Sequence, residues 1–391
     1  MPVVPGINDR VFGVDIATTS DGGAVLGWAQ PIHEDATEVR IVRVAANGTL
    51  VPSRLQPVNR GYVRYDAPDV RRCGDTFVAA WTERSDRKSV RYRRITSAGV
   101  PLDPPSRRAT AESPNDQYLP RIACTGDAML ITWLEKPPVT APPRTEIARG
   151  LLFAAGGERL IEFGPAHDVL AAAIGNELVV VRGVEDGWYE ASHWSGNGTQ
   201  RTPWTRLFNQ QQADCYSDPR GAIESNGDQL MIANVNFCPR RSSHYFVAAR
   251  PFSRELMLLR TPVTFESDFV GNTLDIAAAP DGWLVAWEGE GVRFGRIDRL
   301  FLGLDPSSGI STGGRWPVSA AWNGCTFEIF GPDTITTAAM SGVPTTVPAP
   351  SVEERVATDG AGRRFVVTTE RDDDGAMHVV GRFEDSPRCV R

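Results

Sequence analysis

Short apolar stretches separated by turn residues recur along the whole chain and predict pairs of β-strands. Each copy has a first strand that opens with a β-branched residue, a Gly/Asp turn, and a second strand that ends near a tryptophan. Strong helix signals are missing throughout. The copies are DVRRCGDTFVAAWTE at 69–83, PRIACTGDAMLITWLE at 120–135, LDIAAAPDGWLVAWEG at 274–289 and DIATTSDGGAVLGWAQ at 15–30. The pattern predicts an all-β protein.

The spacing of these copies is regular. Trp81 follows Val70 by 11 residues, and weaker copies keep this spacing without the tryptophan. The second strands end near positions 28, 81, 133, 181, 234, 287, 329 and 367, at intervals between 38 and 53 residues. A period of about forty to fifty residues with four strand-sized segments is typical of a propeller blade.

The remainder of each copy completes such a blade. A third strand, such as VRYRRI at 90–95, is followed by a tight glycine turn, such as TSAGVPL at 96–102, and then by a fourth strand. The last copy has three strands, near 352–358, 363–370 and 376–384, and the extended stretch near 2–8 is expected to supply the fourth. We therefore predict one domain, 1–391, with eight four-stranded blades and a ring closed by strands from both termini. Seven blades are the alternative, if the units near 318–350 and 352–384 share one blade.

With these repeats the chain resembles the β-propeller proteins of the broad kelch and WD-type class. The resemblance covers nearly all residues, but it carries no defining family motif: Gly-His…Trp-Asp repeats are absent. It implies a propeller architecture, which supports enzymes, lectins and scaffolds alike. The repeated tryptophans are expected to pack between neighbouring blades.

Composition excludes several classes of function. The net charge is −7, and Lys88 and Lys136 are the only lysines among 41 basic residues, which indicates a GC-rich, bacterial coding sequence. The arginines alternate with acidic residues and form no basic face, so no nucleic acid is expected as a partner. No apolar run approaches the length of a membrane span, and the opening MPVVPGINDR lacks the basic start and apolar stretch expected of a signal peptide.

Six cysteines without a C-x-x-C pair suggest disulfides rather than a zinc site. Cys73 and Cys124 occupy equivalent turns of neighbouring blades. Projected onto the blades, Cys215 meets Cys238, and Cys325 meets Cys389. Disulfides would place the protein in an extracellular or periplasmic compartment, whereas six free buried thiols and a cytoplasmic location form the alternative.

The candidate ligand-binding residues lie in the loops of one propeller face, which collects the connections between second and third strands and those between blades. Each inter-blade loop carries an aspartate with an aromatic neighbour. The candidates are Tyr65, Asp66, Asp116, Tyr118, Asp214, Tyr216 and Asp268, together with Trp188 and Tyr189 of the loop VEDGWY. Carboxylates there can hydrogen-bond sugar hydroxyls or act as an acid/base pair. In the alternative interpretation, the aspartates start turns and the tyrosines cover the funnel wall.

No catalytic motif, metal-ligand spacing or phosphate loop is present, so no catalytic residue, metal or cofactor is assigned. The long aromatic loops favour a monomeric binding or scaffolding propeller that holds a peptide, protein or glycan. The alternative function is a carbohydrate-directed hydrolase or lyase that uses carboxylates in the axial funnel.

Overall fold

The structure is a computed structural model of the chain, and part of the chain is described by it. The described residues are 3–7, 12–18, 23–33, 36–45, 68–84, 87–103, 106–110, 113–138, 145–184, 187–209, 216–238, 244–268, 270, 274–312, 319–322, 326–330, 334–348, 355–358, 363–371 and 377–385. They form β-strands, turns and connections, and no α-helix occurs among them. The predicted all-β class is confirmed.

The strands form eight antiparallel sheets, of which seven have four strands and one has three described strands. The first sheet consists of β2 (Phe12–Thr18), β3 (Ala24–His33) and β4 (Ala36–Val44), and the second of β5 (Asp69–Cys73), β6 (Thr76–Arg84), β7 (Lys88–Thr96) and β8 (Arg107–Arg108). The third sheet consists of β9 (Asp116–Cys124), β10 (Met129–Lys136), β11 (Ile147–Ala154) and β12 (Gly157–Pro165). The fourth consists of β13 (Asp168–Ile174), β14 (Glu177–Gly183), β15 (Trp188–Ser195) and β16 (Thr205–Asn209).

The remaining four sheets have the same up-and-down order. The fifth sheet consists of β17 (Tyr216–Ser225), β18 (Gln229–Cys238), β19 (His244–Ser253) and β20 (Val263–Ser267), and the sixth of β21 (Leu274–Ala279), β22 (Gly282–Gly289), β23 (Gly291–Asp298) and β24 (Ile310–Ser311). The seventh sheet consists of β25 (Ser319–Trp322), β26 (Phe327–Phe330), β27 (Thr334–Ala338) and β28 (Thr345–Pro348). The eighth consists of β29 (Arg355–Thr358), β30 (Arg363–Arg371), β31 (Met377–Asp385) and β1 (Val3–Ile7). Such repeated four-stranded meanders define a propeller architecture.

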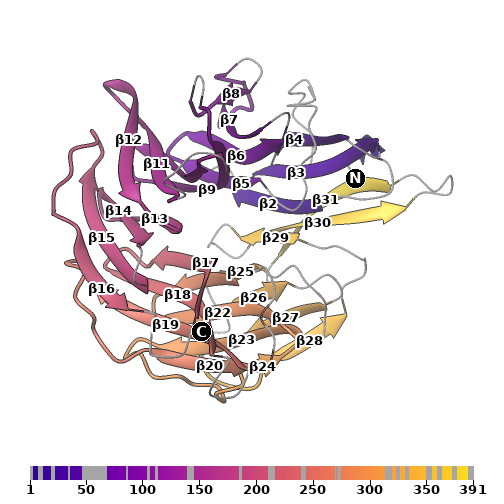
Figure 1. The fold of residues 1–391 in the computed structure, drawn as a ribbon. Coiled ribbons are helices and arrows are strands. Elements are labelled where there is room, and N and C mark those ends of the chain that lie inside the picture. The colour runs from indigo at the N-terminus through magenta and orange to yellow at the C-terminus, as the bar shows by residue number, and fades with distance from the viewer. Residues whose placement is uncertain are drawn as a thin grey trace.

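The first strands of consecutive sheets contact one another from β5 through β29, and β2 contacts both β5 and β29. Figure 1 shows the sheets following one another around the molecule in chain order. The N-terminal strand belongs to the last sheet: β1 pairs antiparallel with β31, with Val3 opposite Val380. This pairing of the N-terminal stretch with the last unit agrees with the sequence prediction.

Three of the four repeated tryptophans are buried where two sheets meet, as the repeat predicted. Trp81, Trp133 and Trp287 have no exposed surface. Trp133 shares an apolar cluster with Val78 and Tyr92 of the preceding sheet, and Trp287 does so with Val247. Aromatic side chains of this size fill the wedge between twisted sheets, and this packing holds the sheets together.

One turn recurs after the third strand of several sheets. A residue at its start uses its side-chain oxygen to accept the backbone N–H four residues later, and a residue three positions on adopts a positive φ. The starting residues are Thr96, Ser195, Ser253 and Asp298, and the positive-φ residues are Gly99, Gly198, Leu256 and Phe301. Glycine accepts this conformation at low cost, whereas Leu256 and Phe301 compensate for it by burial.

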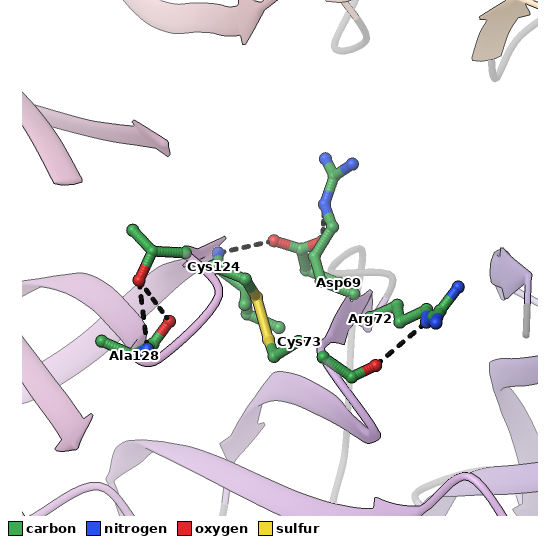
Figure 2. The surroundings of a disulfide bond; sticks show 9 residues. Asp69, Arg72, Cys73, Cys124 and Ala128 are labelled. Atoms are coloured by element: carbon green, nitrogen blue, oxygen red, sulfur yellow. Dashed lines mark hydrogen bonds and ion pairs between the residues drawn. A yellow bond between two sulfur atoms is a disulfide. The ribbon is translucent and has the colours of Figure 1, made fainter. Parts of the chain in front are cut away.

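Two further interactions join the second and third sheets near their inner strands (Figure 2). Asp69 accepts the backbone N–H of Ile122 at 2.8 Å, and Cys73 forms a disulfide with Cys124. The predicted Cys73–Cys124 pair is therefore confirmed. Cys215, Cys325 and Cys389 lie outside the described residues, so the other two predicted pairs do too. No helix in the described part of the chain has the length and apolar character needed to cross a membrane.

Candidate functional site

The predicted residues belong to the loop face, which we define as the side that carries the second-to-third strand connections and the connections between sheets. Tyr65, Asp66 and Asp214 lie outside the described residues, and for Tyr216 the structure describes only the backbone at the start of β17. Asp268 follows β20 of the fifth sheet and is exposed. The four remaining candidates belong to the third and fourth sheets.

Trp188 and Tyr189 begin β15 but face different surroundings. The Tyr189 side chain is fully buried, its hydroxyl donates to Asp168 at 2.9 Å, and its ring stacks on Phe208 at 4.9 Å. Tyr189 therefore packs in the apolar core between the fourth and fifth sheets. Trp188 is half-buried, and the guanidinium of Arg206 lies 5.0 Å from its ring centroid.

The described part of the site centres on Tyr118, in the first strand of the third sheet. The carboxylate of Glu146, which precedes β11, lies close enough to the Tyr118 hydroxyl to raise the pKa of that phenol. His167 lies in the connection from the third sheet to the fourth. It is close enough to Glu146 for the carboxylate charge to act on the pKa of the imidazole. All three side chains are half-buried, so a phenol, a carboxylate and an imidazole meet at one corner of the loop face.

A distorted strand positions Tyr118. The next residue, Leu119, has a φ of 55°, and the pairing of β9 with β10 shifts register between Thr132 and Leu134. Such irregularities redirect a side chain and are frequent beside functional sites. The distorted segment packs against the apolar core between the third and fourth sheets, so the direction of Tyr118 is fixed.

Both lysines of the chain border this tyrosine. The Lys88 ammonium lies 5.8 Å from the Tyr118 ring centroid, and the Lys136 ammonium lies 3.6 Å from Glu146. Asp116 joins them, because it pairs with Lys136 across the strands and its carboxylate accepts the backbone N–H of Lys88 at 3.1 Å. We call these six residues the lysine corner: Lys88, Asp116, Tyr118, Lys136, Glu146 and His167.

His167 is held by a close contact that requires a glycine. A Cβ atom on residue 183 would lie 2.7 Å from Nε2 of His167, so the imidazole packs directly on Gly183. The backbone N–H of His167 also donates to the Gly183 carbonyl at 2.8 Å. Nε2 is buried without a hydrogen-bond partner in the described part of the chain.

The corner holds its phenol and its imidazole in neutral forms. Burial and the neighbouring Glu146 carboxylate raise the pKa of Tyr118 above its ordinary value, and burial lowers the pKa of His167. A protonated phenol and a neutral imidazole are therefore present near neutral pH. Two lysines and two carboxylates balance each other, which leaves a polar corner without net charge. Among the described residues, no cluster of His, Cys, Asp and Glu suits a metal ion.

Alkaline titration tests the environment of this phenol. Tyr118 and Tyr92 are expected to remain protonated in the folded protein at about pH 10.5, where an ordinary tyrosine is mostly ionised. For Tyr92, burial raises the pKa to about 12. Because folding raises these pKa values, both groups favour the folded state below about pH 10, and this stabilisation disappears as the pH rises through the folded values.

The measurement is the near-ultraviolet absorbance of tyrosinate, and the chain has seven tyrosines. Tyr118→Phe and Tyr92→Phe should each leave the absorbance at about pH 10.5 unchanged. If Tyr118→Phe removed a full tyrosinate signal there, the phenol would be solvated rather than buried beside Glu146.

The sequence predicted Asp116 and Tyr118 as ligand-binding residues and placed His167 on the same face without a role, but it did not identify Glu146 or the two lysines as their neighbours. Glu146 and His167 come from connections whose position depends on where each strand ends. The lysines did carry a signal: in a chain that otherwise uses arginine, Lys88 begins β7 and Lys136 ends β10, and both strand ends lie at this corner. Coding bias explains why lysine is rare, but it does not explain where the two lysines lie.

Comparison with known proteins adds fold-level similarity only. No protein-family model and no curated protein sequence matches the chain. A polysaccharide lyase, Uly1, is 15% identical with a TM-score of 0.37, over 57% of this chain and 54% of that one. The acylaminoacyl peptidase of Pyrococcus horikoshii is 9% identical with a TM-score of 0.47, over 94% and 59%. The chain thus spans between half and three-fifths of the length of these two proteins.

The α-L-arabinofuranosidase Arb93A of Fusarium graminearum matches over 98% of this chain and 96% of its own, at 8% identity and a TM-score of 0.45. At such identities and TM-scores, none of these proteins carries an argument about the activity of this chain.

Proposed function

We propose that the eight sheets are the eight blades of one propeller, closed by the strands of both termini. Two observations support this arrangement. The contacts between first strands return from β29 to β2, and β1 provides the outer strand of the last sheet. Closure removes the open sheet edges that would otherwise pair with other chains.

We propose that the protein is a binding propeller and that the lysine corner holds a neutral, hydroxyl-rich ligand of the glycan class. The observation that carries this proposal is the balanced set of donors and acceptors around Tyr118. Its phenol and the carboxylate of Glu146 suit hydroxyl groups, and a charged peptide would leave an uncompensated charge at the corner. The half-buried Trp188 belongs to the adjacent sheet and offers an aromatic surface on the same face.

The alternative, a carbohydrate-directed hydrolase or lyase, needs an acid and a base whose pKa values suit proton transfer near neutral pH. Burial moves the pKa of Tyr118 upward and that of His167 downward, which makes the phenol a weaker acid and the imidazole a weaker base. The Asp116 carboxylate already accepts the backbone N–H of Lys88, and the Lys136 ammonium lies 3.6 Å from Glu146. These features favour binding over catalysis.

Because the chain has two lysines, amine acetylation is a specific probe of the corner. A glycan array first selects a ligand for the folded protein. We expect that ligand to protect Lys88 and Lys136 from acetylation, as measured by mass spectrometry, while the N-terminal amine serves as the reference. Tyr118→Phe and Glu146→Gln should each weaken binding about tenfold, a change of about 1.4 kcal/mol.

Glu162→Gln is the matched control, because Glu162 belongs to the same sheet and its side chain is 57% exposed. It should leave binding unchanged. Equal acetylation with and without the glycan would rule out the lysine corner as the binding site. Shortened glycan products, lost in Glu146→Gln, would instead assign the hydrolase or lyase function.

We further propose that the chain matures as a monomer in an oxidising compartment, extracellular or periplasmic. The Cys73–Cys124 disulfide supports this location, because such bonds persist mainly outside the reducing cytoplasm.

A further inference from the structure

A buried glutamine lies between the two lysine-corner residues of β9. Gln117 is 1% exposed, whereas its chain neighbours Asp116 and Tyr118 are half-buried. Its side-chain oxygen accepts the backbone N–H of Val90 in β7 at 3.0 Å. Its amide nitrogen donates to the Glu135 carboxylate in β10 at 2.7 Å. One side chain therefore joins the third strand of the second sheet to the second strand of the third sheet.

Glu135 accepts several hydrogen bonds at once and is also buried, at 1% exposure. The oxygen that accepts from the glutamine also accepts the indole N–H of Trp133 at 3.2 Å. The other oxygen accepts side-chain hydrogen bonds from Ser113 and Asn115, at 3.4 and 3.3 Å, in the connection that leads into β9. Nε of Arg149 lies 3.4 Å from this second oxygen and supplies the counter-charge. The carboxylate therefore holds the connection from which the corner residues of β9 follow.

The contacts of Gln117 require both ends of an amide. A backbone N–H can only donate and a carboxylate can only accept, so the side chain between Val90 and Glu135 must offer an acceptor to one and a donor to the other. An apolar side chain of the same size would leave both buried groups without this partner. We call Gln117 and Glu135 the inter-sheet clamp.

The fold does not require a carboxylate at the position of Glu135. Trp287 of the sixth sheet corresponds to the tryptophan of β10, because each pairs across the strands with an arginine. Two residues later the sixth sheet has Gly289, and the Trp287 indole N–H has no hydrogen-bond partner in the described part of the chain. The second sheet has Glu83 at this position, where it pairs with Arg91. The third sheet adds a glutamine that joins its carboxylate to the neighbouring sheet.

Lys88 is the corner residue whose position depends most on the clamp, because it belongs to the second sheet. It lies two residues before the backbone N–H that the clamp holds. Its own backbone N–H donates to Asp116 at 3.1 Å, and its ammonium lies 5.8 Å from the Tyr118 ring centroid. Lys136, by contrast, ends β10, and its partner Glu146 directly precedes β11, so that pair lies within the third sheet. Loss of the clamp should therefore release one lysine and not the other.

We propose that Gln117 and Glu135 are positioning residues of the binding site, which hold Lys88 beside Tyr118. This inference rests on the proposed glycan-binding function of the lysine corner. The position of Lys88, however, is measurable without any ligand.

The test measures how fast each lysine of the folded protein reacts with N-hydroxysuccinimidyl acetate, by mass spectrometry after short labelling and relative to the N-terminal amine. In Gln117→Leu we expect Lys88 to react about threefold faster, because local opening exposes it, and Lys136 to keep its parent rate. Gln117→Asn keeps the amide but is too short to reach both partners. It should show the same selective change, and it replaces the leucine variant if that variant does not fold. Glu135→Gln retains an oxygen that accepts from Gln117 and should keep both lysines near their parent rates.

Asp103→Ala is the matched control, because it removes another buried contact of the second sheet, at the other end of β7. It should change neither lysine. An unchanged rate for Lys88 in both Gln117 variants, or an equal rise for Lys88 and Lys136, would overturn the proposal.

Glycan binding gives the second measurement. Gln117→Leu should bind a glycan selected on the array about tenfold more weakly than the parent protein, and Glu135→Gln should rescue most of this loss. Undiminished binding by Gln117→Leu would also overturn the proposal. If the array selects no glycan, the proposed binding function fails, whereas the acetylation rates still decide whether the clamp positions Lys88.

Discussion

Replacing Asp305 by alanine is expected to lower the free energy of unfolding by about 3–5 kcal/mol, because it leaves a buried arginine without its counter-charge. The side chains of Arg296 and Asp305 are 6% and 2% exposed, and Nη2 lies 2.6 Å from Oδ1. Asp305 also accepts the backbone N–H of Arg296. Since Arg296 donates to carbonyls of the seventh sheet as well, the loss should loosen the contact between two sheets. Equilibrium unfolding in urea measures the change.

The second sheet provides a matched control for this prediction. Arg94 pairs with Asp103 through the same set of hydrogen bonds, but the Arg94 side chain is 22% exposed and a second carboxylate, Glu158, lies 3.7 Å away. Water and Glu158 can compensate Arg94, so Asp103→Ala should cost only about 1–2 kcal/mol. Similar losses for both variants would contradict the argument from burial. In the sixth sheet, Arg296→Met combined with Asp305→Ala should recover part of the stability lost in Asp305→Ala.

The strands and their packing follow from the sequence because each repeat encodes them locally. A tryptophan at the end of a second strand is buried where two neighbouring sheets meet, and Trp81, Trp133 and Trp287 all lie in that position. The Arg–Asp pairs also repeat in the sequence, nine residues apart, at 94 and 103 and at 296 and 305. They were not predicted, because arginines that are scattered along a chain and alternate with acidic residues are typical of solvated surface.

The candidate site was less predictable, because it is assembled from several sheets. Tyr118 was identified from its loop, but its direction depends on the positive φ of Leu119, which no propensity predicts for a leucine. Tyr189 carried the same sequence signal as Tyr118, an aromatic residue in a loop, yet its ring faces the core. Successive side chains along a strand point to opposite faces of the sheet. A one-residue difference in where the strand begins therefore decides whether a tyrosine faces the core or the loop face.

Removing the Cys73–Cys124 disulfide with a Cys73→Ser, Cys124→Ser double variant is expected to cost about 4 kcal/mol, on the chain-entropy estimate for a loop of this length. The two cysteines are 51 residues apart in sequence and their Cα atoms are 5.1 Å apart. The bond closes a loop that contains most of the second sheet, so the unfolded chain gains freedom when the bond is lost. Asp69 still joins the same two sheets through Ile122, so the variant should fold.

Unfolding in guanidinium chloride, with and without reductant, separates this bond from the other cysteines. Reductant should destabilise the parent protein by at least the loss seen in the double variant. Any further effect of reductant on the double variant must come from Cys215, Cys238, Cys325 and Cys389, which tests the two remaining predicted pairs. If the parent protein and the double variant unfolded at the same denaturant concentration, the disulfide would contribute nothing to stability, and the case for an oxidising compartment would lose its main support.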